Sequence, residues 1–507
     1  MKGITMVTID VSSKQLFEQK VACYIMLLAH DFGKKDVAIL AKEYPDLHAL
    51  LKKKNFTGKL LQTITVPVRI HNELVYVVLV GMGKQKDEYL EIENYRRALG
   101  KALRVAIDLK CETAAVAVPS ANLFGADVQY LAQQTATIVQ MAAYHFDEYI
   151  SKNKEEDIDL FQVVLCVDAK HATQVKEGAK EGSYIGQAVN MARHWIDLPP
   201  SVLTPPQLAD KAMAIAKEHH LDITVFDKKQ LEKLGMGGIV GVSVGSDIEP
   251  RLVIMEYKTK KKDAPTLAFV GKGITFDSGG LSIKPAVSME TMKDDMSGAA
   301  AVIATMQALA QLKPEVNVVG VTPLAENLPS GKATKPGDIL RFYNGKTAEV
   351  KNTDAEGRLI LADALSYTAQ HYKPDAMIDL ATLTGACSQA LGPFYTGMMS
   401  QHDELIDIVE DAAFHSGDHV WRLPLHDDYK VAIKSDVADL CNIGSGKYRA
   451  GAITAGHFLK NFVGDIPWVH LDIAGTAFDV PDRPYYRSGA TGVGVRLLVD
   501  LAMNWPN

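Results

Sequence analysis

The chain carries, at residues 266–298, the stretch TLAFVGKGITFDSGGLSIKPAVSMETMKDDMSG. The stretch begins as an apolar strand and continues into glycine turns that hold acids and lysines. The same alternation surrounds it, with strand-like runs at 317–326, 376–385 and 468–475 and helical spacing at about 294–311 and 359–370. Apolar strands separated by helices predict a parallel or mixed sheet that helices cover on both faces.

The first part of the chain repeats this alternation. Strand-like runs cover 74–83, 113–120 and 160–168, helical spacing covers 94–110 and 127–150, and a charged loop is expected at 151–159. A longer helix is expected over about 172–197, because the prolines of LPPSVLTPP (198–206) forbid its continuation. We therefore expect an α/β protein of two domains, residues 1–180 and 181–507, each a mixed or parallel sheet flanked by helices.

The composition limits the classes of protein to consider. Of the 507 residues, 47% are hydrophobic and 23% are charged, which excludes a mainly disordered chain. The 54 Lys and Arg against 61 Asp and Glu leave a net charge of −7, which gives a general nucleic-acid binder no support. Five cysteines without a CxxC pair indicate reduced thiols in a cytosolic protein. We expect neither a signal peptide nor a membrane span, because no suitable apolar run occurs.

Acidic side chains concentrate in two short glycine-rich segments that follow apolar strands. Five candidates lie in the first stretch and in KNTDAEGRL (351–359): Asp277, Asp294, Asp295, Asp354 and Glu356. Ligands bind at the carboxyl ends of strands in α/β sheets, and grouped carboxylates repel one another unless cations offset their charge. Two divalent metal ions would meet this need, and could activate a water and polarise a carbonyl or phosphoryl group. The alternative is that these residues are solvated acids in loops. Two separate clusters, each at the end of a strand, weaken this alternative.

The residue types leave several roles open. Asp294 and Asp295 begin an Ala-rich helix, where one of them could simply cap the helix, and physical chemistry alone does not choose between them. Lys272 and Lys284 could pair with the carboxylates as cations, or a lysine that has lost its proton could bind a metal. The guanidinium of Arg358 could hold a carboxylate-like or bicarbonate-like anion.

These segments resemble the metal-binding segments of the leucyl aminopeptidase (cytosol aminopeptidase) family of two-metal exopeptidases. The resemblance rests on the signature octapeptide NTDAEGRL (352–359), on VGKGITFDSGGLSIKP (270–285) and on MKDDMSGAA (292–300). The segment NMARHWIDLPPSVLTPPQLA (190–209) resembles the opening of the family's catalytic domain. The match covers 185–507, so the resemblance implies that the larger C-terminal domain is catalytic.

The resemblance implies two divalent metal ions per chain, Mn²⁺ or Zn²⁺. One ion would be held by Lys272, Asp277, Asp295 and Glu356, and the other by Asp277, Asp354 and Glu356 with the backbone carbonyl of Asp354. Asp277 and Glu356 would therefore bridge, and Asp295 is selected over Asp294. Two catalytic residues that bind no metal are implied as well: Lys284, which would stabilise the oxyanion, and Arg358, which would hold a bicarbonate acting as general base.

The implied function is a leucyl aminopeptidase acting on peptides with a free N-terminus. Met292, Thr384 and Gly385 match regions that line the pocket for the first residue, although ordinary strand-end packing is their alternative role. An apolar pocket discriminates by only about 1–3 kcal/mol per methylene, so a preference for Leu within a broad range is expected.

The resemblance further implies a cytoplasmic homo-hexamer, built as a dimer of trimers. Some bacterial relatives also bind DNA, for which the net charge of −7 gives no support here. Two rival functions are kept. A two-metal phosphoesterase would leave the lysine ligand unexplained, and a DNA-binding or structural hexamer without catalysis would leave the intact ligand set unexplained.

Overall fold

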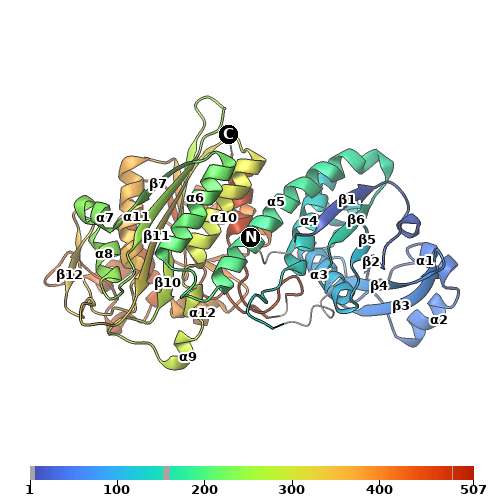
Figure 1. Cartoon of the computed structure of the whole chain (residues 1–507), viewed down its shortest axis with the longest axis horizontal. Coiled ribbons are helices and arrows are strands. Elements are labelled where there is room, and N and C mark those ends of the chain that lie inside the picture. Colours follow the sequence, from blue (N-terminus) through green and yellow to red (C-terminus); the bar gives the residue numbers. More distant parts are fainter. Residues whose placement is uncertain (1–5, 152–159, 482, 507) are drawn as a thin grey trace. The chain divides into compact units, whose positions relative to one another are not determined.

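The computed structural model describes residues 6–151, 160–481 and 483–506 (Figure 1). The chain divides into two compact units, Met1–Asn190 with Asp482–Arg487, and Met191–Pro481 with Ser488–Asn507. Both units are α/β, which confirms the expected fold class, whereas the boundary expected between residues 180 and 181 stays a prediction. The charged loop expected at 151–159 lies outside the described residues from residue 152 onward.

The first unit is built on a six-stranded sheet in the order β1-β6-β5-β2-β4-β3. Its strands are β1 (Thr8–Ser12), β2 (Cys23–Ala29), β3 (Thr63–Ile70), β4 (Glu73–Gly83), β5 (Thr113–Ala117) and β6 (Gln162–Cys166). Its helices are α1 (Ala38–Glu43), α2 (Leu47–Lys53), α3 (Ile92–Asp108), α4 (Val128–Ala143) and the first part of α5 (Ala172–Asp197). The sheet is parallel apart from the antiparallel hairpin of β3 and β4. Almost every residue of β2 is buried, as expected for a strand covered on both faces.

The helix expected over 127–150 is shorter than the sequence pattern predicts. The Asp127 carboxylate caps the helix by accepting from two backbone N–H groups of the first turn, and the helix ends at Ala143. Tyr144 already has an extended backbone and is buried, so its ring enters the core where the helix would otherwise continue. The expected end was wrong because a side chain can be buried from a helical or from an extended backbone, so the apolar pattern alone does not mark where the helix ends.

The second unit contains a nine-stranded sheet with the path β16-β15-β18-β14-β9-β11-β8-β7, and β10 pairs with β11 beside this path. The strands are β7 (Asp222–Phe226), β8 (Arg251–Tyr257), β9 (Thr266–Gly271), β10 (Gly273–Asp277), β11 (Asn317–Asn327), β14 (Ala376–Ala381), β15 (Thr396–Met399), β16 (Val420–Arg422) and β18 (Trp468–Asp472). The central strands β18, β14, β9 and β11 run parallel, so their carboxyl ends share one edge. A small separate sheet is formed by β12 (Ile339–Arg341), β13 (Thr347–Glu349) and β17 (Leu440–Cys441).

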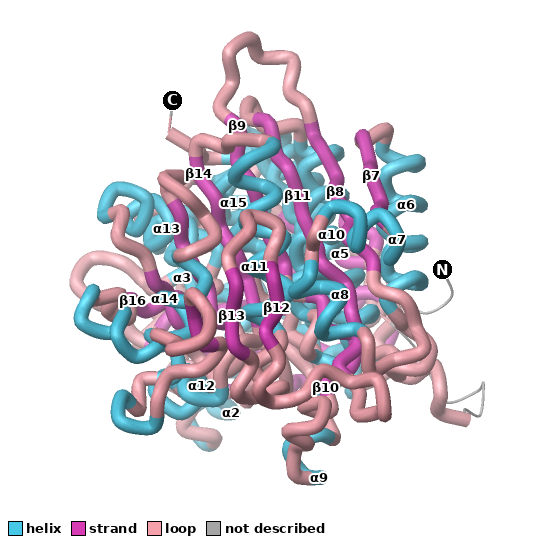
Figure 2. The backbone as a smooth tube through the Cα atoms, turned by 90° about the vertical axis from the view of Figure 1, so that its left-hand side faces the viewer, coloured by secondary structure: helices cyan, strands magenta, loops and turns pink. Residues whose placement is uncertain are grey.

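Helices lie on both faces of the large sheet (Figure 2). They are α6 (Pro205–His219), α7 (Lys228–Leu234), α8 (Gly237–Ser243), α10 (Ser297–Leu312), α11 (Gly357–His371), α12 (Gly385–Leu391), α13 (Asp403–Ser416), α14 (Gly451–Lys460) and α15 (Val495–Met503), and the short α9 (Ala286–Met289) stands in a loop. Of the described residues, no helix combines the length and the apolar character that crossing a membrane requires.

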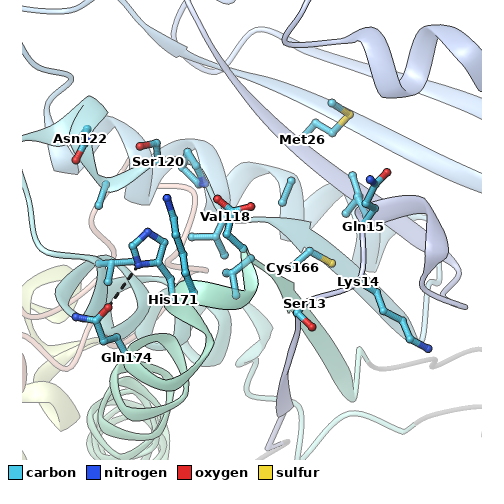
Figure 3. Close-up of a pocket in the computed structure, with 18 of the residues that line it drawn as sticks. Ser13, Lys14, Gln15, Met26, Val118, Ser120, Asn122, Cys166, His171 and Gln174 are labelled. Atoms are coloured by element: carbon cyan, nitrogen blue, oxygen red, sulfur yellow. Dashed lines mark hydrogen bonds between the residues drawn. The ribbon is translucent and has the colours of Figure 1, made fainter.

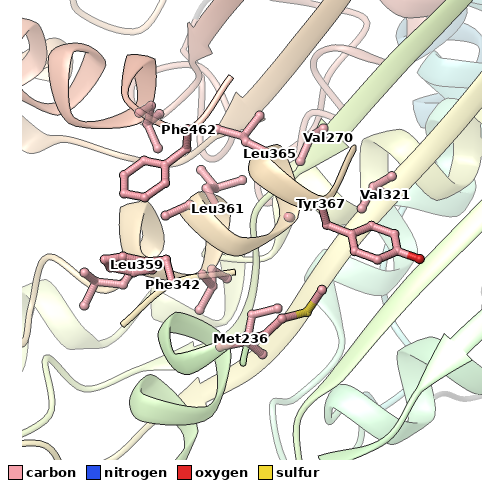
Figure 4. Close-up of a cluster of buried hydrophobic side chains, with 14 of the residues drawn as sticks. Met236, Val270, Val321, Phe342, Leu359, Leu361, Leu365, Tyr367 and Phe462 are labelled. Atoms are coloured by element: carbon pink, nitrogen blue, oxygen red, sulfur yellow. The ribbon is translucent and has the colours of Figure 1, made fainter. Parts of the chain in front are cut away.

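Strand β11 shows how the two helix layers are held. Successive side chains of a strand point to opposite faces of its sheet. A Cβ on Gly320 would lie only 2.9 Å from Met306 of α10, so this face of β11 packs closely against that helix. Val321 instead belongs to a buried apolar cluster with Leu361 and Leu365 of α11 (Figure 4). Each fully buried Leu or Val contributes about 1.5–3 kcal/mol, so this packing anchors the helices that begin at the carboxyl ends of the strands.

Candidate metal centre

The two acidic segments meet at the carboxyl ends of the central strands. Lys272 occupies the break between β9 and β10, and Asp277 is the last residue of β10. Glu356 immediately precedes α11. Ion pairs join the segments, since Lys272 Nζ lies 2.9 Å from Glu356 Oε1 and Lys284 Nζ lies 2.7 Å from Asp354 Oδ1.

Lys272 lies almost fully buried among acidic and carbonyl oxygens. Its Nζ lies 2.7 Å from Asp295 Oδ1 and donates a hydrogen bond of 2.8 Å to the carbonyl of Thr382. Burial by itself would lower the pKa of Lys272, but the charges of Asp295, Glu356 and Asp277 outweigh it, and the pKa is raised. Without another cation in the cluster, Lys272 is therefore an ammonium ion.

Lys284 links the ends of the two segments. Its Nζ lies 2.8 Å from Asp277 Oδ2 as well as near Asp354, and its side chain is 14% exposed. Burial alone would lower the pKa of Lys284, but Asp277 and Asp354 raise it above its usual value. Burial and the charge of Glu356 in turn raise the pKa of Asp277 to about 6, against the opposing effect of both lysines.

The cluster carries more negative than positive charge. It comprises four carboxylates and two lysines: Asp277, Asp295, Asp354, Glu356, Lys272 and Lys284. Asp295 Oδ2 and Glu356 Oε2 are buried without a hydrogen-bond partner, and an unsatisfied buried acceptor costs about 1–3 kcal/mol.

Three of these residues, Asp277, Asp354 and Glu356, offer oxygens that lie within 4.8 Å of one another. Carboxylate oxygens with uncompensated negative charge fit divalent metal ions, which would satisfy both the charge and the open acceptors. The residues present therefore fit a metal centre.

Glycine at two places makes this convergence feasible. Gly279 and Gly280 both have positive φ, at 86° and 62°, and turn the chain sharply after Asp277. At Gly357, a Cβ would lie 2.5 Å from Lys272 Cε and 2.7 Å from its Nζ. The signature segment can therefore approach Lys272 only because residue 357 has no side chain.

The geometry distinguishes the two adjacent aspartates that the residue types left open. Asp295 pairs with Lys272 and accepts a hydrogen bond of 2.8 Å from the Thr382 hydroxyl. Asp294 is buried with its Oδ1 unpartnered, and burial raises its pKa to about 7. Helix α10 begins at Ser297, so the expected start at residue 294 was wrong: residues 292–294 instead form a short 3₁₀ turn.

Arg358 lies in the first turn of α11 and is 6% exposed. Its Nη1 donates a hydrogen bond of 2.7 Å to the carbonyl of Asn442, and its buried Nε has no hydrogen-bond partner. Burial lowers the pKa of Arg358 to about 10, while Glu356 and Asp472 favour the charged form. The guanidinium is therefore a buried cation with donor capacity to spare, which suits it to hold an anion.

The three residues expected to line the substrate pocket lie in two separate segments, the 3₁₀ turn before α10 and the start of α12. Met292 is half-buried in the turn before Asp294. Thr384 caps α12, because its hydroxyl accepts from the N–H of Cys387 and donates to Asp472 Oδ2 at 2.7 Å. Gly385 is exposed with open space around it. Thr384 thus has a structural role, and its contact with substrate stays a prediction.

Three residues that the sequence analysis did not single out support the cluster. Thr382 contacts both Lys272 and Asp295, Asn442 accepts from Arg358, and Asn327 donates to Asp277 Oδ1 at 2.8 Å. Each is a polar residue within or just after an apolar strand. That position was the one signal available in the sequence, and it does not reveal which residue each of them contacts.

The first unit has a cavity of its own at the carboxyl ends of β1, β5 and β6, with a volume of about 690 Å³ (Figure 3). Its lining carries charges of both signs, Lys14 and Lys170 against Asp36, Asp127 and Asp168, and all five side chains are exposed. Among the described residues, no polar side-chain atom that lines the cavity is both buried and without a hydrogen-bond partner. This cavity therefore shows no set of converging groups that would select a ligand.

Comparisons with known proteins relate both units to one family. Residues 190–499 match the model described as "Cytosol aminopeptidase family, catalytic domain", and residues 35–153 match "Cytosol aminopeptidase family, N-terminal domain". A probable cytosol aminopeptidase of Roseiflexus castenholzii is 42% identical over 471 residues, which cover 90% of this chain and 93% of that protein. A probable cytosol aminopeptidase of Alkaliphilus oremlandii is 40% identical over 453 residues, covering 89% and 90% of the two chains.

Two solved structures share the fold of the whole chain. A mutant of tomato leucine aminopeptidase matches with a TM-score of 0.88 at 31% identity, covering 99% of this chain and 97% of that one. The bottromycin maturation enzyme BotP in complex with Mn matches with a TM-score of 0.84 at 30% identity, covering 95% and 99%.

Proposed function

The chain belongs to the cytosol aminopeptidase family, as the resemblance predicted, and is a metal-dependent aminopeptidase; we propose that it releases N-terminal amino acids, Leu preferred within a broad range, from peptides with a free α-amino group. The buried, negatively charged cluster at the strand ends supports this proposal most directly, because it offers divalent cations a site beside a buried arginine.

Two divalent ions, when bound, would acidify a water molecule and polarise the scissile carbonyl, which is the chemistry that peptide hydrolysis needs. We assign one ion to Lys272, Asp277, Asp295 and Glu356, and the other to Asp277, Asp354 and Glu356 with the carbonyl of Asp354. Asp277 and Glu356 would serve both ions and so fix their positions relative to each other. Lys272 would bind as a neutral amine, since a divalent cation held by Asp295 and Glu356 would supply the positive charge that the Lys272 ammonium group supplies without it. Mn²⁺ is present in the BotP neighbour, and Mn²⁺ or Zn²⁺ is proposed here.

Two residues that bind no metal complete the proposed reaction. Lys284 has a raised pKa, so its ammonium group stays charged at neutral pH and can stabilise negative charge on the carbonyl oxygen. Arg358 would hold a bicarbonate through its unused donors and so place a proton acceptor beside the attacking water. Met292, Thr384 and Gly385 would line the pocket for the first side chain.

The remaining proposals concern the setting of the enzyme. We propose a cytoplasmic location, which fits the name cytosol aminopeptidase that the relatives carry, and a homo-hexameric assembly. The domain boundary between residues 180 and 181 is likewise proposed. Sedimentation velocity would test the oligomer, and a mass near that of one 55.3 kDa chain would contradict it.

The function is tested by comparing leucine p-nitroanilide with its N-acetylated form. The enzyme is stripped with a chelator and then refilled with Mn²⁺ or Zn²⁺. We expect metal-restored cleavage of the free amine only, because an acylated nitrogen is neither basic nor a metal ligand. Equal cleavage of both forms would contradict exopeptidase specificity, and no cleavage with any metal would favour the phosphoesterase or non-catalytic alternatives.

A further inference from the structure

Asn327 is the last residue of β11 and lies between the two metal-holding segments. It is 4% exposed. Its side-chain Nδ2 donates a hydrogen bond of 2.8 Å to Asp277 Oδ1 and another of 2.9 Å to the backbone carbonyl of Thr353. Asp277 ends the first segment and Thr353 directly precedes Asp354 in the second. One amide group therefore ties together the two segments that the proposed ions share.

The partners of Asp277 explain why an amide serves at this position. Asp277 Oδ1 also accepts from the N–H of Gly279 at 2.9 Å, while Oδ2 faces the Lys284 ammonium at 2.8 Å. Asn327 and Gly279 are neutral donors, so they orient the carboxylate without adding a positive charge that would repel a metal ion. A lysine at the same place would compete with the ion for Asp277. Hydrogen bonds of this kind to a ligating carboxylate typically set metal affinity by about 10–100-fold.

The backbone of Asn327 has a separate, structural role. Its carbonyl accepts from the N–H of Ser278 at 3.0 Å and from the Ser278 hydroxyl at 2.7 Å. These bonds hold the end of β10 against β11 and involve no atom of the Asn327 side chain. The side chain and the backbone can therefore be tested by different substitutions.

We infer that Asn327 is a positioning residue whose side-chain amide sets the orientation of Asp277 and its separation from Asp354, and thereby the retention of the metal ion that these two residues share. The inference rests on the proposed metal assignment. It predicts that removing the amide selectively weakens the binding of one ion, while the other ion, held through Lys272 and Asp295, is retained.

The test compares Asn327→Leu, which keeps the size of the side chain but removes both donors, with Ser278→Ala. The second substitution removes the two buried hydrogen bonds of the Ser278 hydroxyl, one donated to the Asn327 carbonyl and one accepted from the Gly280 N–H, where β10 ends beside β11. Full-length proteins are loaded with Mn²⁺ and dialysed against graded chelator, and the metal per chain is measured by elemental analysis. The Mn²⁺ spectrum in electron paramagnetic resonance reports whether two ions remain coupled. The midpoint of thermal unfolding of the metal-free proteins measures the structural cost of each substitution.

We expect Asn327→Leu to lose one ion at a chelator concentration about 10–100-fold lower than the unsubstituted protein does, with loss of the coupled spectrum. Ser278→Ala should retain both ions like the unsubstituted protein, although both variants unfold at lower temperature. Asn327→Ser, which keeps one donor, should lie between them and also serves if the leucine variant does not fold.

Two results would overturn the inference, and they are distinct from a failure of the proposed function. Equal retention of both ions by Asn327→Leu, or by Asn327→Ser if the leucine variant does not fold, would reduce Asn327 to a structural residue. Equal loss of an ion by Ser278→Ala would trace the effect to the pairing between the ends of β10 and β11 rather than to the amide. By contrast, an unsubstituted protein that binds fewer than two ions would overturn the metal assignment itself.

Discussion

The two units end their parallel strands in opposite ways. In the first unit, the carboxyl ends of β1, β5 and β6 open into a cavity of about 690 Å³, whose charged side chains have both signs and are exposed. In the second unit, the corresponding edge is filled by Lys272 and Lys284 among buried carboxylates. The volume of a cavity is therefore a poor guide to chemistry in this molecule. Buried charge that lacks full compensation is the better guide, because a bound ligand or metal ion can supply the missing compensation.

The largest difference between the two edges should come from removing one acid at each. Asp354→Ala should lower metal content by about one ion per chain and reduce turnover by about a thousandfold or more, since several kcal/mol of charge stabilisation are lost. Asp168→Ala, at the cavity of the first unit, should leave both quantities unchanged. Elemental analysis and kcat measurements provide the comparison. Full metal content in Asp354→Ala would contradict its assignment as a ligand.

A second test concerns the close approach of the signature segment to Lys272. Gly357→Ala places a methyl group against the lysine, which must then move away from Asp295 and Glu356. Because the end of a flexible side chain gives way, we expect the thermal midpoint to change little, while kcat/KM falls by about a hundredfold as the site is misplaced. Gly331→Ala is the matched control, since nothing lies within 4 Å of its Cβ position. Comparable activity in the two variants would show that the contact has no functional role.

A smaller effect is expected from the buried arginine. Arg358→Ala should lose the stimulation of turnover by added bicarbonate, together with about tenfold or more of the rate, because proton transfer loses its positioned acceptor. Arg358→Lys should regain little, since an ammonium group does not hold a planar anion in two hydrogen bonds. Rates measured over a range of bicarbonate concentrations decide this. Unchanged stimulation in Arg358→Ala would place the anion elsewhere.

The smallest predicted effect is the pH dependence of the metal-free protein. Burial raises the pKa of Asp277 from its usual 3.8 to about 6 and that of Asp294 to about 7. Both groups therefore bind protons more readily when folded, and the stability that they contribute is present below about pH 4 and lost as the pH rises through 6 to 7. For Asp277 this amounts to about 3 kcal/mol. Calorimetry of the stripped protein should show the midpoint of thermal unfolding falling from pH 5 to pH 8. A midpoint that rises over this range would contradict the raised pKa values of these two buried acids.

The central elements of the fold could be predicted because their patterns have one interpretation. The apolar run at 74–83 and the helix at 172–197 are present as β4 and α5. Where a sequence pattern allowed two interpretations, the observed end of the strand differs from the predicted end. The run at 376–385 ends as a strand at Ala381, because Thr384 turns to cap α12, and the run at 468–475 ends at Asp472.

The candidate site could be predicted from its charged residues, but its supporting residues could not. Acids and lysines in glycine turns are rare enough to attract attention, so all six members of the cluster were named from the sequence. Asn327 and Thr382 stand at the ends of apolar strands, where a polar residue is ordinary. Their roles depend on which residues of distant segments they reach, and this information exists only in three dimensions.

The central claim is that the buried charge of the second unit holds two divalent ions. It is tested most directly by titrating the stripped, full-length protein with Mn²⁺ while recording bound metal per chain and hydrolysis of leucine p-nitroanilide in the same samples. We expect binding to saturate at two ions per chain, and activity to require both. Saturation below two ions in a folded protein, or full activity in the stripped one, would contradict the claim.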